Sequence, residues 1–299
     1  MSGPAPTGGG AAPLAARQRW QIAGITAGAL LIWLGLRSLG GPPSLSPMDF
    51  VVGGSDALQF CDPNHPRFLP VVARSLPVTL KVAPSGDRLI LTTVTGKPVG
   101  PREVAPTDGV PLRLFLVNRA LTRFYSADPA PAERTGEWRL DFDRRAPEAL
   151  RIFADLTPAA LGREIYASAD LPALGVPAGA QAPAAPPEGG WRFELASAPA
   201  RLSALQPILL TLTAERTDGA PAVLTPVGGS RAQLVVFDQA CTGMAHLRSV
   251  ETTASPPGRP RAQASFEVTF PDSGPYVLWA QLELNGRPVL ERFTREVTP

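Results

Sequence analysis

The sequence predicts an all-β chain of two tandem β-sandwich domains behind a single N-terminal transmembrane helix. Three observations support this fold class. A charge-free apolar run lies near the N-terminus, and short runs rich in Val, Leu, Phe and Thr, separated by Pro/Gly turns, follow it. Two stretches of this second region also align with each other without a gap. Many short strands at regular spacing are typical of sandwiches and barrels.

Composition excludes several classes of function. The 299 residues include 28 basic and 26 acidic side chains but only 2 His and 2 Cys. This balance, without a basic block, argues against nucleic-acid binding. So few His and Cys exclude His-rich metal cages, zinc sites built from four cysteines, and disulfide frameworks. The G-x-S-x-G, phosphate-loop and C-x-x-C-H motifs are also missing from the sequence, so we predict a protein that is not an enzyme; a hydrolase with an unfamiliar site stays an alternative.

The N-terminal segment predicts a membrane anchor. Residues 1–16 have no charged side chain and little bulk, which predicts a disordered cytoplasmic tail. Residues 17–39 are predicted to form a transmembrane signal-anchor helix. Their uncharged run, residues 20–36, is about 26 Å long as a helix, near the short limit for a membrane span. Trp20 and Trp33 stand toward its two ends, as interfacial aromatic residues do.

A cleavable secretory signal is the alternative interpretation of this segment. Such signals end in a small-residue A-x-A site, whereas this run exits through LRSLGG. We therefore predict an uncleaved anchor. Arg17 and Arg19 precede the run and favour an N-terminus in the cytoplasm. The remaining chain is then expected in the periplasm or outside a bacterial cytoplasmic membrane.

The exported part contains an internal repeat. Residues 112–122 (LRLFLVNRALT) align with residues 232–242 (AQLVVFDQACT), and residues 150–156 (LRIFADL) align with residues 276–282 (YVLWAQL). Order and approximate spacing are kept, which predicts a duplicated domain of roughly 100 residues.

The repeat sets the predicted domain boundaries. We expect the first sandwich, with an N-terminal extension, at residues 40–172 and the second at residues 191–299. Residues 173–190 between them include PAGAQAPAAPPEGG, which predicts a semi-rigid linker.

Alternation shows which side chains of each copy turn inward. In residues 137–143 (EWRLDFD), apolar and charged residues alternate, as in a half-buried antiparallel strand. The second copy repeats the pattern in residues 265–270. The predicted inward-facing side chains are Trp138, Leu140 and Phe142 in the first copy and Phe266, Val268 and Phe270 in the second.

The second copy has a sharper signature at residues 272–276 (DSGPY). This D-x-G-x-Y form is seen in immunoglobulin-like sandwiches, where the Tyr hydroxyl bonds to upstream backbone and fixes a corner between strands. Leu278 stands where antibody domains place a disulfide Cys, which predicts apolar packing there. The sequence therefore predicts two immunoglobulin-like domains, with the corner in the second copy.

The segment from Gly219 to Val297 resembles the YtkA-like immunoglobulin-like domain of bacterial envelope proteins. The resemblance rests on LVVFD at residues 234–238, GMAH at residues 243–246 and FPDSGPYVLWAQ at residues 270–281. It implies an immunoglobulin-like sandwich, and the first copy joins it through the repeat. Family members often carry a second His two residues after the first; here Arg248 stands at that position.

Cys241, Met244 and His246 form a candidate metal site. Thiolate, thioether and imidazole within six residues are a soft ligand set suited to Cu(I). The alternative is that Cys241 and Met244 pack as hydrophobes in a loop while His246 caps a turn.

Cys61 and Cys241 are candidate partners in a disulfide. An exported chain meets an oxidising compartment, and a bond between them would clamp the two copies together. Two unpaired thiols are the alternative.

An apolar stripe on the outer sheet face of both copies predicts an interface. Its aromatic members are Phe115, Phe153, Phe237 and Trp279, which we assign to binding of a membrane or envelope protein. The alternative is that the two domains bury these stripes against each other. The predicted function is a membrane-anchored, exported, non-enzymatic scaffold or accessory subunit without a cofactor. A periplasmic copper-binding or copper-delivery module is the alternative.

Overall fold

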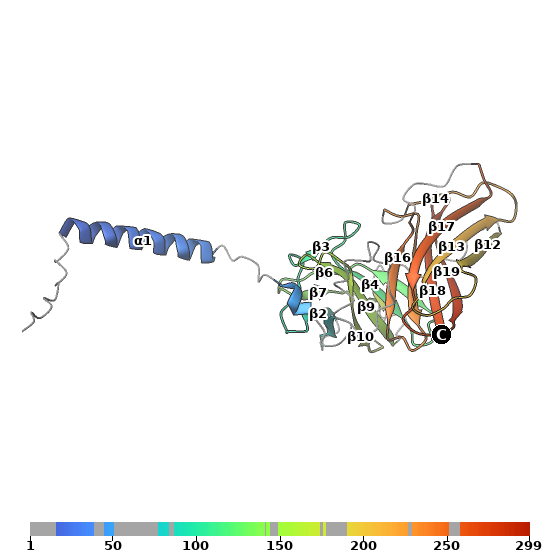
Figure 1. The fold of residues 1–299 in the computed structure, drawn as a ribbon, viewed down its shortest axis with the longest axis horizontal. Coiled ribbons are helices and arrows are strands. Elements are labelled where there is room, and N and C mark those ends of the chain that lie inside the picture. The colour runs from blue at the N-terminus through green and yellow to red at the C-terminus, as the bar shows by residue number, and fades with distance from the viewer. Residues whose placement is uncertain are drawn as a thin grey trace, which may run out of the picture. The chain divides into compact units, whose positions relative to one another are not determined.

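The computed structural model describes residues 16–38, 45–50, 77–83, 87–140, 142–143, 149–173, 176–177, 190–226, 229–250 and 258–299. Two compact units make up the chain, residues 1–44 and residues 45–299. The first contains a helix, and the second, which we call the β body, is built of antiparallel strands (Figure 1).

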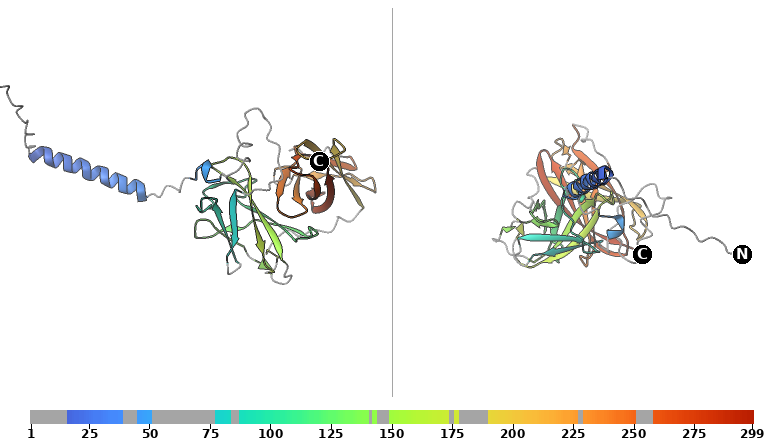
Figure 2. Two further views of the ribbon diagram at one scale, coloured as in Figure 1. Left: turned by 60° about the horizontal axis from the view of Figure 1, so that its bottom comes forward. Right: turned by 90° about the vertical axis from the view of Figure 1, so that its left-hand side faces the viewer.

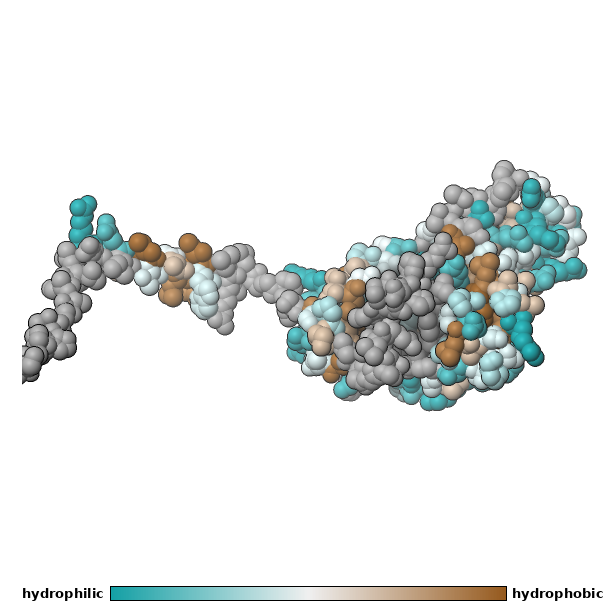
Figure 3. Space-filling view, viewed as in Figure 1, coloured by the Kyte–Doolittle hydropathy of each residue, from teal (hydrophilic) through white to brown (hydrophobic). Residues whose placement is uncertain are grey.

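The predicted N-terminal helix is present as α1 (Ala16–Ser38). Apolar residues, brown in Figure 3, alternate with paler ones along it. Within the described residues, however, no helix combines enough length with enough apolar character to cross a membrane. The transmembrane assignment of residues 17–39 is therefore not confirmed. The tail predicted at residues 1–16 lies, apart from Ala16, outside the described residues.

The first half of the β body contains two sheets. One has the order β1-β2-β7-β6 and the other β10-β9-β4-β5, with β3 pairing to β9. The elements are η1 (Pro47–Phe50), β1 (Val78–Val82), β2 (Arg88–Thr93), β3 (Val104–Ala105), β4 (Arg113–Val117), β5 (Phe124–Ala127), β6 (Ala130–Pro131), β7 (Glu137–Arg139), β8 (Phe142–Asp143), β9 (Leu150–Pro158), β10 (Ile165–Leu171) and β11 (Val176–Pro177).

The second half repeats this plan. Its first sheet has the order β12-β13-β17 and its second β14-β18-β15-β16, with β19 pairing to β18. The strands are β12 (Trp191–Ala198), β13 (Pro207–Arg216), β14 (Leu224–Thr225), β15 (Ala232–Asp238), β16 (Met244–Arg248), β17 (Arg261–Thr269), β18 (Gly274–Leu284) and β19 (Arg287–Val297). In Figures 1 and 2 the green strands of the first half lie beside the orange and red strands of the second.

Period-two alternation places one face of each strand in a core. In β13, Ile208, Leu210 and Leu212 are buried, whereas Leu209 between them is exposed. The two sheets of the second half enclose an apolar core that includes the predicted inward residues Phe266, Val268 and Phe270. The first half encloses its own core around Trp138, whose indole N–H donates to the Val99 carbonyl at 3.2 Å. Leu140 is buried there as predicted; the side chain of Phe142 lies outside the described part.

The corner predicted in the second copy is present. The Tyr276 hydroxyl donates to the Asp272 carbonyl at 3.1 Å, and its ring lies 4.6 Å from that of Phe270 between centroids. Leu278 is fully buried in the core, so apolar packing occupies the position of a cross-sheet disulfide.

Strand register confirms that the two copies are built alike. Phe115 of β4 pairs with Phe153 of β9, and the aligned residues Val235 and Trp279 pair between β15 and β18. The short strands agree as well. Val104 of β3 pairs with Pro158 of β9, and the equivalent residues of the second copy, Leu224 of β14 and Leu284 of β18, also pair. Each second-copy residue stands 120 residues after its counterpart in β3 or β4, or 126 residues after its counterpart in β9, which are the offsets of the sequence alignment.

The same turn closes β4–β5 and β15–β16. Leu121 and Cys241 occupy the left-handed region, with φ of 53° and 56°, and each donates its N–H to a carbonyl three residues back at 2.8 Å. The side chain of Asn118 accepts from the N–H groups of Thr122 and Arg123, and Asp238 accepts from those of Thr242 and Gly243. These side-chain bonds explain why Asn and Asp stand at this position of the repeat.

Two residues within the predicted linker pair with the first half. Residues 173–190 were expected to form a semi-rigid linker, and within them Val176 and Pro177 form β11, which pairs with β8 of the first half. The start of this segment is thereby tied to the first sandwich by backbone hydrogen bonds.

Candidate functional site

A third apolar cluster lies between the two halves, and we call it the aromatic interface. It joins the outer face of the β4–β9 sheet to the outer face of the β15–β18 sheet and is as well buried as either core. Its members are Phe115, Val117, Leu121, Phe124, Phe153 and Tyr166 from the first half, and Val235, Phe237, Cys241, Met244, Val277 and Trp279 from the second.

Both copies contribute the same positions to this interface. The register that equates Phe115 with Val235 and Phe153 with Trp279 also equates Val117 with Phe237. Leu121 matches Cys241, and Phe124 matches Met244, on the adjoining turn and strand. One patch therefore meets its own duplicate, as the patches of a two-fold symmetric dimer do, but within a single chain.

Aromatic rings connect the halves directly. Phe124 stacks on Trp279 with ring centroids 5.6 Å apart, and Phe153 meets Phe237 at 5.3 Å. A polar contact adds to them, since Arg292 Nε donates to the Leu121 carbonyl at 2.8 Å. Aromatic pairs of this kind contribute about 0.5–1.5 kcal/mol each beyond the area that they bury.

The assignment of the aromatic stripe to a separate partner requires correction. Phe115, Phe153 and Phe237 are 0% exposed and Trp279 is 4% exposed. They face outward from their own sandwiches, as alternation predicted, but the other half of the same chain covers them. The second of the two interpretations, intramolecular burial, therefore describes these four side chains.

A buried group of polar side chains lies beside the aromatic interface, and we call it the polar cluster. It spans both halves, and the ring of His246 lies against Phe115 at 4.8 Å between centroids. Its members are Asp108, Asp155, Glu164 and Tyr166 from the first half, and Gln233, His246 and Arg248 from the second.

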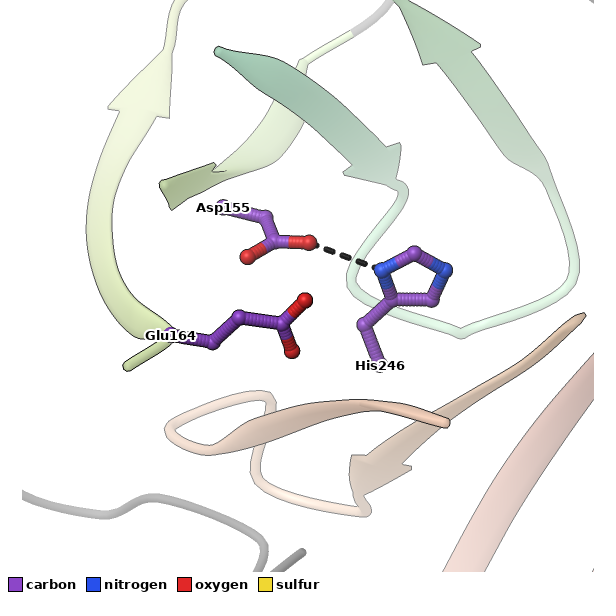
Figure 4. A group of neighbouring side chains, drawn as sticks. All are labelled: Asp155, Glu164 and His246. Atoms are coloured by element: carbon purple, nitrogen blue, oxygen red, sulfur yellow. Dashed lines mark hydrogen bonds and ion pairs between the residues drawn. The ribbon is translucent and has the colours of Figure 1, made fainter. Parts of the chain in front are cut away.

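His246 is bonded on every side. Its Nδ1 lies 2.7 Å from Asp155 Oδ2, the contact dashed in Figure 4, and its Nε2 lies 3.2 Å from Gln233 Oε1. Its backbone N–H donates to the Tyr166 hydroxyl at 3.0 Å. Because two of these three partners belong to the first half, His246 fixes one sandwich to the other.

Arg248 makes a second polar connection between the halves. Its guanidinium is hydrogen-bonded to the Glu164 carboxylate, and its Nε donates to Asp108 Oδ2 at 3.1 Å. The side chains are largely but not fully buried, with 25% of Arg248 and 26% of Glu164 exposed. The polar cluster thus reaches the surface at this ion pair.

Burial controls protonation in the polar cluster. It raises the pKa of Glu164, and the neighbouring Asp155 carboxylate raises it further against the opposing charge of Arg248. Burial likewise raises the pKa of the Tyr166 hydroxyl well above its ordinary range, so this residue stays a neutral phenol. Negative charge on the side chains of the polar cluster is therefore energetically unfavourable, and this limits which ligands the cluster can bind.

Three of these residues present potential metal ligands to one another. One ligand atom each from Asp155, Glu164 and His246 lies within 4.8 Å of the others (Figure 4). Asp155 Oδ1 is buried and has no hydrogen-bond partner among the described residues. A buried carboxylate oxygen without a partner is unusual and calls for an explanation.

The predicted sulfur site is not assembled in the same way. His246 directs its two ring nitrogens at Asp155 and Gln233, whereas Cys241 and Met244 belong to the aromatic interface. Burial raises the pKa of the Cys241 thiol to about 11, so the thiol stays protonated at neutral pH when no metal is bound. Cys241 forms no disulfide with another described residue. Its proposed partner Cys61 lies outside the described residues, so that pairing stays a prediction.

The sequence contained a signal for the polar cluster that our interpretation missed. Asp155 stands two residues after Phe153 in the apolar run LRIFADL, on the same face of β9. A carboxylate on a face that is otherwise aromatic requires a buried partner. Glu164 and its pairing with Arg248 carry no comparable signal, because their proximity depends on how the halves dock.

A small apolar surface lies on the opposite side of the second half, and we call it the outer strip. It follows the exposed face of β13 and its cross-strand neighbour in β12, and its members are Ala198, Leu205, Pro207 and Leu209. Leu205 is 70% exposed and adopts a φ of 60°, held by its N–H donating to the Phe270 carbonyl at 2.8 Å. A bulky exposed residue in this backbone region is uncommon and marks a candidate contact point.

Comparisons with known proteins add one family match. The family called Domain of unknown function (DUF8832) matches residues 188–299, which is the second half of the β body. A search of curated proteins finds no match.

Solved structures offer distant likenesses. One is the alkylpurine DNA glycosylase AlkC of Pseudomonas fluorescens bound to DNA with an abasic site analog, at 14% identity and a TM-score of 0.25, covering 37% of this chain and 31% of that one. Another is a β-glycosidase from Bacteroides vulgatus, at 14% identity and a TM-score of 0.18, covering 77% and 25%. This chain thus spans a third or less of their lengths, and likenesses at such TM-scores carry no argument.

Proposed function

We propose that the protein is a non-enzymatic binding scaffold, whose two immunoglobulin-like sandwiches act as one rigid body and bind a protein partner through outer sheet faces. The observation that carries this proposal is the aromatic interface. Because its aromatic side chains are as buried as those of the cores, relative motion of the halves would expose them to water at a cost of about 25 cal/mol per Å². A fixed body of this kind suits the presentation of a surface.

The use of His246 supports a role outside catalysis. Its side chain is 0% exposed, and both ring nitrogens are engaged inside the polar cluster. A general base must reach the proton of a substrate. Here the imidazole instead connects the two halves.

The outer strip is the surface that we assign to the partner. Leu205 and Leu209 are 70% and 39% exposed on a sheet face that is otherwise rich in Thr, Glu and Gln. Neighbouring Ala198 and Pro207 are short and rigid, so an apolar partner side chain would order little of the surface on binding.

Pull-down of the full chain in gentle detergent, followed by mass spectrometry, tests the proposal. A partner captured by the wild type is expected to be lost with Leu209→Glu. The matched control is Val94→Glu, at a residue 43% exposed in the first half, which should retain the partner. Equal thermal unfolding of both variants shows that the fold is intact. Retention of every partner by Leu209→Glu would remove the outer strip from the proposal.

Localisation forms a second part of the proposal. We infer that residues 17–39 attach the chain to a bacterial cytoplasmic membrane and that the β body lies outside the cytoplasm. Large apolar side chains of α1, among them Trp20, Leu31 and Trp33, are exposed and available to lipid. Alkaline extraction of membranes tests attachment, and protease added to spheroplasts tests the side. Recovery of the full-length chain in the alkaline-soluble fraction would contradict attachment.

A further inference from the structure

The polar cluster is rich in carboxylates. Among the described residues, the carboxylates of Asp108 and Glu164 both pair with the guanidinium of Arg248, and the carboxylate of Asp155 contacts the His246 ring. Three carboxylates therefore share one guanidinium and one imidazole in these contacts. Uncompensated charge in a buried site is strongly unfavourable. A cation bound among these carboxylates would remove that penalty.

The geometry points to where such a cation would sit. Asp155 Oδ2 is bonded to His246, but Asp155 Oδ1 is buried and lacks a partner in the described part of the chain. In Figure 4 the two carboxylates and the imidazole converge from three separate strands and loops, with the Glu164 carboxylate beside both other groups. Their ligand atoms lie within 4.8 Å of one another. Small changes of side-chain rotamer would bring all three within bonding distance of one ion.

We propose that Asp155, Glu164 and His246 bind one divalent transition-metal ion of the zinc class, which clasps the two halves of the β body together. Two carboxylate oxygens and one imidazole nitrogen suit such borderline ions better than Cu(I), which prefers sulfur. The ion would supply the missing partner of Asp155 Oδ1 and offset negative charge of the carboxylates, and His246 Nδ1 would exchange its contact with Asp155 Oδ2 for the ion. Glu164, with 26% of its side chain exposed, provides the route by which it enters.

The three proposed ligands occur at only one of the two equivalent ends of the interface between the copies. By the register of the repeat, Ser126 corresponds to His246, Gln281 to Asp155 and Pro288 to Glu164. The corresponding end of the pseudo-symmetric interface therefore carries no carboxylate or imidazole at these positions. The three ligands are not a by-product of duplicating one sandwich.

The experiment measures metal content in the full chain. The purified protein is stripped with chelator, dialysed and titrated with Zn²⁺ alone, and bound zinc is counted by mass spectrometry of the element. The wild type is expected to hold about one ion per chain. Asp155→Asn and Glu164→Gln, which keep side-chain shape, should weaken binding by about 100-fold.

Three control variants separate this site from others. Cys241→Ser and Met244→Leu should keep the zinc, because sulfur takes no part. His65→Ala, which removes the other histidine of the chain, should keep it too. Glu215→Gln removes a carboxylate paired with Arg261 at 3.1 Å on the outer sheet and controls for loss of charge alone.

A second measurement keeps the proposal testable if a variant fails to fold. Co²⁺ added to the stripped wild type should give visible bands of an oxygen- and nitrogen-bound ion without the intense near-ultraviolet absorption of thiolate ligation. Zinc below one ion per ten chains in the wild type would overturn the proposal and leave protons as the neutralising group. Thiolate absorption, or loss of zinc with His65→Ala, would overturn the assigned ligands. The partner experiment does not depend on any of these outcomes.

Discussion

Phe124 of the first half stacks on Trp279 of the second with ring centroids 5.6 Å apart and planes inclined by 23°. The contact joins two residues that stand in different copies of a repeat. It converts the outer faces of two sandwiches into the interior of one body. Trp279 is therefore a core residue, although alternation along β18 turns it away from the core of its own sandwich.

Trp279→Ala is expected to destabilise the β body by about 3–5 kcal/mol, because it empties the centre of the aromatic interface. Urea unfolding followed by circular dichroism measures the change. Trp279→Phe is the matched control. It keeps most of the volume and removes an indole N–H that is buried without a partner in the described residues, so it should cost less than about 1.5 kcal/mol. If Trp279→Ala is as stable as the wild type, the halves do not pack through this residue.

Tyr276→Phe is expected to destabilise the protein by about 1 kcal/mol. The substitution keeps the ring against Phe270 and removes the hydroxyl that donates to the Asp272 carbonyl at 3.1 Å. Chemical denaturation gives the magnitude. The wild-type value within error would mean that the corner is held by ring packing alone.

Most of the fold of each half could be predicted from the sequence, because local patterns determine it. Alternation in β13 and β17 identifies the core face, and the DSGPY segment identifies the corner at Tyr276. The alignment of the copies gives register as well, since a one-residue slip would turn Val235 and Trp279 to the opposite face.

The docking of the halves could not be predicted in the same way. The sequence shows that a sheet face is apolar and therefore has to be buried, but it does not show which surface buries it. For this reason the sequence left two interpretations of Phe153 and Trp279 open. The polar cluster was missed for a related reason, because Asp155 and His246 are 91 residues apart and meet only once the halves are docked.

The duplicated turn allows a swap experiment. Asp238 accepts from Thr242 N–H at 2.7 Å, from Gly243 N–H at 2.8 Å and from the Thr242 hydroxyl at 2.6 Å. Asp238→Asn installs the residue that the first copy uses at Asn118, so its loss of stability should stay below about 1 kcal/mol. Asp238→Ala leaves these donors unpaired and should cost about 1–3 kcal/mol.

The difference between the two variants is the readout, measured as the shift in urea midpoint at constant slope. Asn118→Asp provides the reciprocal control in the exposed turn and should be nearly neutral. Equal losses for Asp238→Asn and Asp238→Ala would show that the negative charge, rather than the shared turn geometry, is what the second copy requires.

Cys241 makes the stability of the protein depend on pH in the alkaline range. Burial raises its pKa from an ordinary 9.0 to about 11, so the unfolded chain releases the thiol proton first as the pH rises. The stabilising contribution of the buried thiol is full below 9.0 and is lost as the pH rises towards 11. In a Cys61→Ser background, wild-type Cys241 should therefore lose more stability between these limits than Cys241→Leu.

Leucine is the matched replacement because Leu121 occupies the equivalent position, in the same left-handed backbone region and the same interface. Thiol labelling supplies an independent check. At pH 8 the folded Cys61→Ser protein should react with iodoacetamide at least 10-fold more slowly than the urea-unfolded chain, because the thiolate is the reactive species and the buried thiol rarely forms it. Equal rates in the two states would mean that Cys241 is accessible, and the aromatic interface would then have to open readily at this turn.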